Sequence, residues 1–227
     1  MQASPLDVVP LGEVTHTAVQ SGLWNHPSTW DNGVPSSGAK VYIPSGKVVT
    51  INQVISTRLK WIRLEGKLEF SKTNNTQLKV ESLIGTVTSE VEIGSNIEPV
   101  ASQVLAQIIF IDEGPLDLIQ DFGQFGKGWV MMGKTRVFGA PKLSWTSLEI
   151  APKAGDTFLE LTEAPVGWVV GDQIVVTGTQ IDQIESDEKR TVAGIEGKKI
   201  LLNAPLSLDH IPPPGYDLKV HVANLSR

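Results

Sequence analysis

The sequence contains no cysteine in its 227 residues. This absence excludes a disulfide framework, a thiolate zinc site and a thiol nucleophile. No apolar run reaches about 18 residues, the length that indicates a membrane-spanning helix. The first residues also lack the basic start and apolar stretch of an export signal. We therefore expect no membrane-spanning segment.

Positive charge is scarce as well, since 19 lysine and arginine residues stand against 25 aspartate and glutamate residues, for a formal net charge of −6. This balance argues against a nucleic-acid partner, because such binding releases counterions through many basic side chains. A P-loop, a dinucleotide fingerprint, an HExxH motif and a nucleophile elbow are all missing. Turn residues are abundant, with 21 glycines and 14 prolines, and long helical patterns are not seen. We predict an all-β fold.

A strand–glycine–strand unit recurs three times in the first half. The segments VYIPSGKVVTI, WIRLEGKLEF and VESLIGTVTSEVEI bend at Gly46, Gly66 and Gly85, which are 20 and 19 residues apart. Such a period is typical of a β-solenoid, whose coils stack because none can bury its faces alone. An antiparallel meander of hairpins uses the same bends and stays as the alternative.

The pattern of strands and turns changes in the second half. From Thr146 onward the strands are short and the turns closely spaced, which predicts a small sandwich or barrel with a boundary near residue 145. The closing segment DLKVHVANLS is more like the first half, and we expect it to resume the solenoid. Residues 113–129 are dense in glycine and proline and predict a loop of about 15 residues, long enough to suggest a function.

The opening segment SGLWNHPSTWDNGVPSSGAKVYIPSGKVVTIN resembles the start of the eight-glycine (G-eight) domain family, in which two tryptophans, a Gly-Val-Pro and a glycine-rich strand entry follow in this order. The similarity continues through RLEGKLEF, VEIGSNIEP and VFGAPKLSWTSL. It implies a right-handed parallel β-helix (β-solenoid) with a small β-sandwich or barrel subdomain. The division would be an extension over 1–19, the eight-glycine domain over 20–145 and a small β subdomain over 146–227 that leads into a truncated β-helix.

Members of this family include hyaluronan-binding and hyaluronan-degrading cell-surface proteins and secreted bacterial β-helix proteins, and the lack of cysteine resembles a bacterial member. The resemblance implies a secreted or cell-surface, monomeric module that binds a polysaccharide, such as a uronate-containing one. Two alternatives stay open. One is part of a glycoside hydrolase or polysaccharide lyase completed by further β-helix, and the other is a structural cap of an adhesin. Phe138 stands where hyaluronan-active relatives often carry a histidine.

The segment between Asp121 and Glu149 has no acidic residue but four basic ones. Its aromatic side chains offer flat faces for sugar rings, and its cations pair with uronate carboxylates. The predicted ligand-binding residues are Lys134, Arg136, Lys142, Trp145 and Trp129. The alternative is that the aromatic residues belong to the core and the cations to a solvated face.

Trp24 and Trp30 lie six residues apart in a turn-rich segment. We interpret them as a structural cap that plugs the open end of a solenoid, with ligand stacking as the alternative.

Carboxylates and a histidine near residues 182–210 suggest acid–base chemistry. The catalytic candidates are Asp182, Glu188 and His210, since paired carboxylates cleave glycosidic bonds. The alternative is a structural cluster in which Arg190 pairs with Glu188. No cofactor is expected. Calcium is an open option through this acidic run or through the carboxylates of residues 112–121, although neither has EF-hand spacing.

Overall fold

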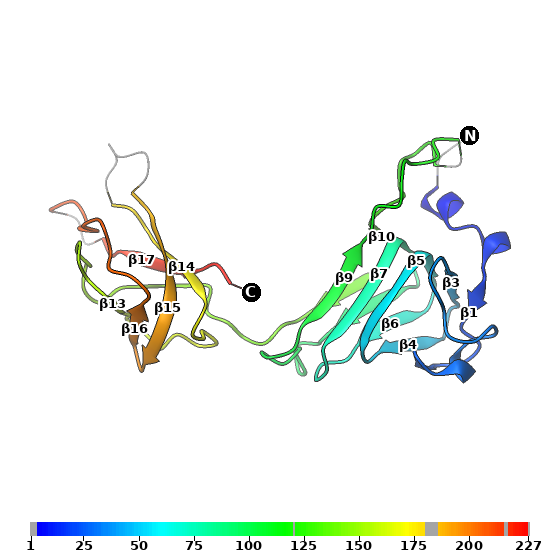
Figure 1. Cartoon of the computed structure of the whole chain (residues 1–227), viewed down its shortest axis with the longest axis horizontal. Coiled ribbons are helices and arrows are strands. Elements are labelled where there is room, and N and C mark those ends of the chain that lie inside the picture. The colour runs from blue at the N-terminus through cyan, green and yellow to red at the C-terminus, as the bar shows by residue number, and fades with distance from the viewer. Residues whose placement is uncertain (1–3, 120, 180–185, 216–217, 227) are drawn as a thin grey trace. The chain divides into compact units, whose positions relative to one another are not determined.

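The computed structural model describes residues 4–119, 121–179, 186–215 and 218–226, and it divides the chain into two compact units, residues 1–140 and 141–227. Strands and short 3-10 turns make up the regular structure of the described residues (Figure 1). The predicted all-β class is confirmed. Nowhere in these ranges does a helix have the length and apolar character needed to cross a membrane.

The first unit is built from two parallel sheets that the chain visits in turn. One sheet has the order β1-β3-β5-β7-β10, with β9 also paired to β7, and the other has the order β11-β8-β6-β4-β2. Figure 1 shows β3, β5, β7 and β9 side by side. The strands are β1 (His16–Thr17), β2 (Gly22–Leu23), β3 (Lys40–Ile43), β4 (Val48–Ile51), β5 (Val54–Leu64), β6 (Lys67–Phe70), β7 (Thr76–Gly85), β8 (Glu90–Ile93), β9 (Ala106–Phe110), β10 (Trp129–Met131) and β11 (Lys134–Val137).

Buried side chains form columns across neighbouring strands of this unit. In the first sheet Val41 pairs with Ile62, which pairs with Leu83, and all three are fully buried. In the second sheet Leu68 lies between two buried valines of β4 and β8. The alternation of apolar and polar residues along each strand directs one set of side chains into the core. The glycine bends at Gly46 and Gly66 connect one sheet to the other.

The N-terminal extension belongs to the first unit. Its 3-10 turns η1 (Pro5–Val8) and η2 (Leu11–Glu13) precede β1, and Val9 is fully buried against Trp61 and Ile84 in a second apolar cluster. Trp61 and Ile84 neighbour core-facing Ile62 and Leu83 in sequence, so they project from the opposite face of the first sheet. The extension therefore covers that outer face.

The predicted loop leaves the sheet between β9 and β10. β9 pairs with the first half of β7, and β10 pairs with its second half. The two strands therefore share one position in the sheet beside β7, and the segment between them is inserted there. The buried Asp121 carboxylate accepts the N–H groups of Phe125 and Gly126 at 2.8 Å each. The Lys127 N–H donates to the Ser82 hydroxyl at 2.9 Å. These bonds anchor the insertion to the sheet.

The second unit is a six-stranded antiparallel sheet with the order β12-β17-β14-β15-β16-β13. Its strands are β12 (Trp145–Ser147), β13 (Phe158–Glu160), β14 (Gln173–Val176), β15 (Glu188–Glu196), β16 (Lys199–Leu202) and β17 (His221–Asn224). Leu148 and Leu161, next to the two end strands, form an antiparallel bridge. The sheet therefore curls back on itself around a core that includes Trp168, Ile174 and Val222.

One expectation for the second half differs from the structure. The closing segment was expected to resume the parallel arrangement, but β17 lies antiparallel between β12 and β14. Its pattern could not reveal this, because apolar and polar residues alternate in the same way in both kinds of sheet when one face is buried. The two compact units divide between Ala140 and Pro141.

Candidate functional site

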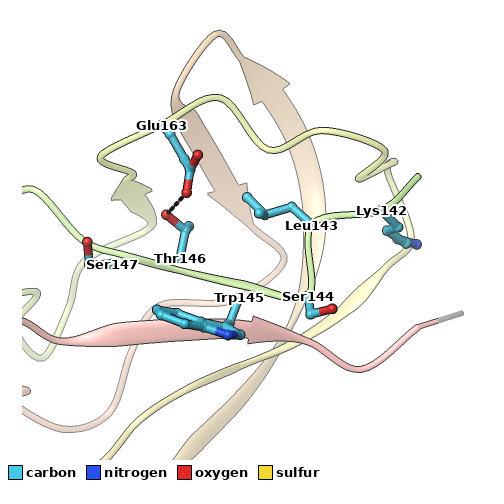
Figure 2. Close-up of a pocket in the computed structure, with 7 residues that line it drawn as sticks. All are labelled: Lys142, Leu143, Ser144, Trp145, Thr146, Ser147 and Glu163. Carbon is cyan, nitrogen blue, oxygen red and sulfur yellow. Dashed lines mark hydrogen bonds between the residues drawn. The ribbon is translucent and has the colours of Figure 1, made fainter.

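A groove in the second unit runs along β12 (Figure 2). It lies between two backbone hydrogen bonds that join residues 143–147 to residues 162–166. The Leu143 N–H donates to the Val166 carbonyl oxygen at 2.8 Å, and the Thr162 N–H donates to the Ser147 carbonyl oxygen at 3.0 Å. Its volume is about 490 Å³, and its lining residues are Lys142, Leu143, Ser144, Trp145, Thr146, Ser147 and Glu163.

Trp145 is the one exposed tryptophan among the six of this protein, all of which the structure describes. Its side chain is 59% exposed, while Trp24, Trp30, Trp61 and Trp168 are at most 5% exposed and the sixth is half-buried. The Trp145 ring meets the His221 ring of β17 edge to face, with centroids 5.2 Å apart. This contact orients the indole while leaving much of it accessible to a ligand.

The polar groups of the groove are themselves partly engaged. The Glu163 carboxylate accepts the Thr146 hydroxyl at 3.1 Å, and Figure 2 shows both side chains on the opposite side of the strand from Trp145. Lys142 points away from Glu163, and its Nζ binds the buried Asp172 carboxylate at 2.8 Å. The predicted ligand-binding cation Lys142 is thus already neutralised, and the groove itself presents a carboxylate.

Asp172 is held ionised by its neighbours. Burial raises the pKa of its carboxyl group, but hydrogen bonds from Lys142, the Val169 N–H and the Asn224 amide outweigh burial, so the pKa lies below its ordinary value. Asp172 and Asn224, at 2.8 Å, also join the start of β14 to the end of β17. Asp172 was not among the predicted site residues, because its only local signal is the Gly-Asp turn before an apolar strand.

The other predicted ligand-binding residues lie in the first unit. Lys134 and Arg136 are exposed on β11, and the Arg136 guanidinium binds the Glu90 carboxylate of β8 at 2.5 Å. Trp129 on β10 is half-buried and packs against the main core of that unit. The predicted set of five is therefore divided between the two units, with Lys142 and Trp145 together in the groove.

The catalytic candidates Glu188 and His210 meet inside the second unit. His210 is fully buried, with Nδ1 2.8 Å from the Thr177 carbonyl oxygen and Nε2 3.1 Å from the Glu188 carboxylate. Both ring nitrogens are thus occupied within the protein. Asp182, the third candidate, lies outside the described residues.

Glu188 fastens the segment that precedes His210. Its carboxylate accepts the N–H groups of Ser207, at 2.8 and 3.0 Å, and of Leu208, at 2.7 Å, and it forms an ion pair with Arg190. Burial raises its pKa, but these donors together with His210 outweigh burial and keep the pKa below its ordinary value. Arg190 also donates to the Pro205 carbonyl oxygen at 2.7 Å. This geometry corresponds to the structural alternative raised for Arg190 and Glu188.

Trp24 and Trp30 meet at the N-terminal end of the first unit. Both are buried, their rings lie edge to face at 4.9 Å, and the Trp30 indole N–H donates to the Trp24 carbonyl oxygen at 2.8 Å. The backbone N–H of Trp24 donates to the Thr50 carbonyl oxygen of β4 at 2.9 Å. This bond joins the pair to the second sheet. Both rings therefore contribute to the core rather than to the surface.

The acidic residues considered for calcium are largely committed to other partners. Asp112 pairs with Lys127, which together with the Gly114 N–H lowers the pKa of Asp112, and Glu113 binds Arg58 at 2.8 Å. In the described ranges, no three His, Cys, Asp or Glu side chains are grouped as a metal site requires.

These observations define an all-β protein in which a parallel, two-sheet unit precedes an antiparallel one that carries an exposed tryptophan groove. The model of the G8 domain family matches residues 29–149, more than half of the chain. The chain belongs to the G8 domain family, which confirms the resemblance. The matched region ends just after the groove segment of β12.

Similarity to curated proteins extends over both units. The chain is 29% identical to a G8 domain-containing protein of Dictyostelium discoideum over 99% of its own length and 20% of the relative. Human fibrocystin-L is 26% identical over 83% of this chain and 4% of the relative, and mouse fibrocystin is 27% identical over 81% and 4%. The chain thus spans a fifth or less of these relatives. No solved structure matches.

Proposed function

We propose that this chain is an extracellular, polysaccharide-binding module whose ligand occupies the groove beside Trp145. The observation that carries the proposal is the exposure of this one tryptophan. Leaving 59% of an indole in water forgoes about 3 kcal/mol of apolar burial. Five other tryptophans are buried or half-buried, so an exposed one beside a groove indicates a surface that a partner covers.

The groove offers the two kinds of contact that a sugar needs. The indole face is flat and apolar and suits the C–H face of a pyranose ring, while its oriented N–H and the hydroxyl-bearing residues nearby supply hydrogen bonds. Trp145 and Glu163 flank the strand on opposite sides, so a chain seated at the edge of β12 can contact both. One stacked ring with two or three hydrogen bonds corresponds to micromolar to millimolar affinity, the order reached by about 4–8 kcal/mol.

The charge of the groove refines the class of glycan. A uronate carboxylate needs an unpaired cation, but Lys142 is bound to Asp172, and Glu163 adds negative charge that repels an acid. We therefore favour a neutral, hydroxyl-rich polysaccharide at this groove. A uronate polymer would instead require Lys134 and Arg136 of the first unit, where Arg136 is paired with Glu90.

A glycan array followed by calorimetry on the hits tests this function. Trp145→Ala should abolish measurable binding. Phe158→Ala is the matched control, because Phe158 is another exposed aromatic residue of the same unit, at 42%, and lies under Lys199 outside the groove. Binding by the control and loss in the groove variant would support the proposal. Equal affinity of both variants would refute it.

A structural role for the first unit is the second candidate. Its parallel sheets, visited alternately by the chain, favour successive coils of a right-handed β-helix. The buried pair Trp24 and Trp30 would then cap the first coil. The observation in favour is that, within the described residues, β2 is the last strand of this sheet. The Trp24 backbone N–H, directly after β2, bonds to Thr50 of β4. Destabilisation of this unit without loss of glycan binding, on replacement of Trp30, would separate this role from the first.

A further inference from the structure

The core of the first unit ends in an exposed side chain at β11. Along one column of the second sheet, Ile51 pairs with Phe70, Phe70 with Ile93 and Ile93 with Val137. Their exposed fractions are 0%, 2%, 9% and 59%. Phe70 and Ile93 are buried because β6 and β8 each have a neighbouring strand on both sides. Ile51 is buried because the segment with Trp24 and Trp30 lies beyond β4. Val137 occupies the same core-facing position with no described strand beyond it.

The backbone of β11 also has a free edge. Within the described residues β11 is the end strand of its sheet and pairs only with β8. The N–H groups of Lys134 and Phe138 donate to the Ser89 and Ile93 carbonyl oxygens of β8 at 2.9 and 2.8 Å. Because successive residues of a strand direct their N–H groups to opposite edges, those of Thr135 and Val137 point away from β8. This edge is a template for another strand.

The outward side chains of β11 specify the charge of such a strand. Lys134 stands next to Glu90, and Arg136 stands next to Glu92. Arg136 binds Glu90 at 2.5 Å and lies 3.8 Å from Glu92. At these two positions β8 carries two carboxylates and β11 carries two cations. Opposite charges at neighbouring cross-strand positions stabilise a sheet, while like charges destabilise it.

We propose that the free edge of β11 is a docking site for an extended peptide strand that is acidic at two alternate positions and apolar at the position beside Val137. One acidic residue would pair with Lys134, and the other would share the five-donor Arg136 guanidinium with Glu90. The apolar residue would cover Val137, and the backbone would bond to Thr135 and Val137. The sequence of β8, Glu-Val-Glu-Ile, has this pattern. The inference is independent of glycan binding, which concerns another unit.

A second copy of the chain does not fit this edge. Two β11 strands related by a twofold axis would run antiparallel, and the register that pairs them along their length about Thr135 places Lys134 and Arg136 of one copy opposite the same two cations of the other. Like charges directly opposite each other are destabilising, and basic residues on edge strands commonly prevent such association. The cations therefore select an acidic partner and disfavour self-association.

Fluorescence anisotropy with the full chain tests the proposal. The probe is a labelled peptide with the sequence of residues 86–94, TVTSEVEIG, and the comparison peptide has lysine in place of both glutamates. We expect the acidic peptide to bind about tenfold more tightly, as two favourable pairs replace two unfavourable ones. The double variant Lys134→Glu, Arg136→Glu should reverse this preference and bind the lysine peptide better.

A backbone variant separates strand addition from simple charge attraction. Thr135→Pro removes an N–H that β8 does not use, and proline is tolerated on an edge strand whose N–H faces solvent. Thermal unfolding should therefore be little changed, while binding of the acidic peptide falls about tenfold or more. Failure of the acidic peptide to bind the wild type, equal binding of both peptides, or unchanged binding by a folded Thr135→Pro variant would each overturn the proposal.

Discussion

Replacement of Glu188 distinguishes a structural carboxylate from a catalytic one. The Glu188 side chain is 6% exposed and accepts hydrogen bonds from Ser207, Leu208 and His210 besides its ion pair with Arg190. Glu188→Ala leaves these donors without their acceptor. Removing one partner of a buried ion pair costs about 3–5 kcal/mol, and Glu188→Gln, which retains one oxygen acceptor, should cost about 1–3 kcal/mol. Such a loss is expected of a structural carboxylate, whereas a carboxylate whose contacts are made only with a substrate would leave stability little changed.

Hydrogen exchange measured by mass spectrometry in increasing denaturant assigns this loss to the second unit. Peptides from residues 186–210 should lose protection in Glu188→Ala, while peptides from the first unit serve as an internal reference. Glu196→Ala is the matched control, because Glu196 is an exposed carboxylate at the other end of β15 and should change stability by less than about 0.5 kcal/mol. A loss below about 1 kcal/mol in Glu188→Ala would refute the structural assignment.

The same interaction predicts a pH dependence. The pKa of Glu188 is lower in the folded protein than its ordinary value of 4.5. Its contribution to stability is therefore fully present above about pH 5 and is lost as the pH falls through the folded-state pKa, because the unfolded chain then binds the proton more tightly. The stability difference between wild type and Glu188→Gln should shrink below pH 4.5. A difference that stays constant down to acid unfolding would contradict this reasoning.

Two further predictions concern the first unit. Trp30→Ala removes a buried ring and the hydrogen bond to the Trp24 carbonyl oxygen, and it should lower the free energy of unfolding by about 3–5 kcal/mol in denaturant titrations; a loss below 1 kcal/mol would show that the pair is not part of the core. Gly66→Ala places a Cβ 2.3 Å from the Pro44 carbonyl oxygen, so the bend between β5 and β6 must shift and the melting temperature should fall by several degrees. Gly128→Ala, with nothing within 4 Å of its added Cβ, is the control and should melt close to the wild type, and equal melting of both variants would contradict the close approach at Gly66.

The sequence predicted features that depend on local pattern. The recurring bends at Gly46 and Gly66 follow from short apolar-alternating strands joined by turns, and the structure has both bends as links between its two parallel sheets. The long insertion was predicted for the same reason, because glycine and proline are dense there and alternation is lost. Trp24 and Trp30 are both buried, and their role as a cap at the end of a solenoid stays a prediction.

The site was harder to predict because its contacts join distant residues. Lys142 was interpreted as a ligand-binding cation, yet its partner Asp172 follows 30 residues later. Trp129 and Trp145 look alike in sequence, but one packs on the core of the first unit and the other is exposed in the second. The antiparallel position of β17 likewise depends on long-range pairing, which alternation along a single strand does not specify.

The most direct test of the proposed function is a titration of the tryptophan indole N–H signals in a nitrogen-15 correlation spectrum with a glycan that the array identifies. The protein has six tryptophans, and the signal that disappears in Trp145→Phe identifies the groove. We predict that this signal shifts with saturation at a defined glycan concentration while those of the buried tryptophans stay in place. Glycan binding that leaves the Trp145 signal unmoved would contradict the account.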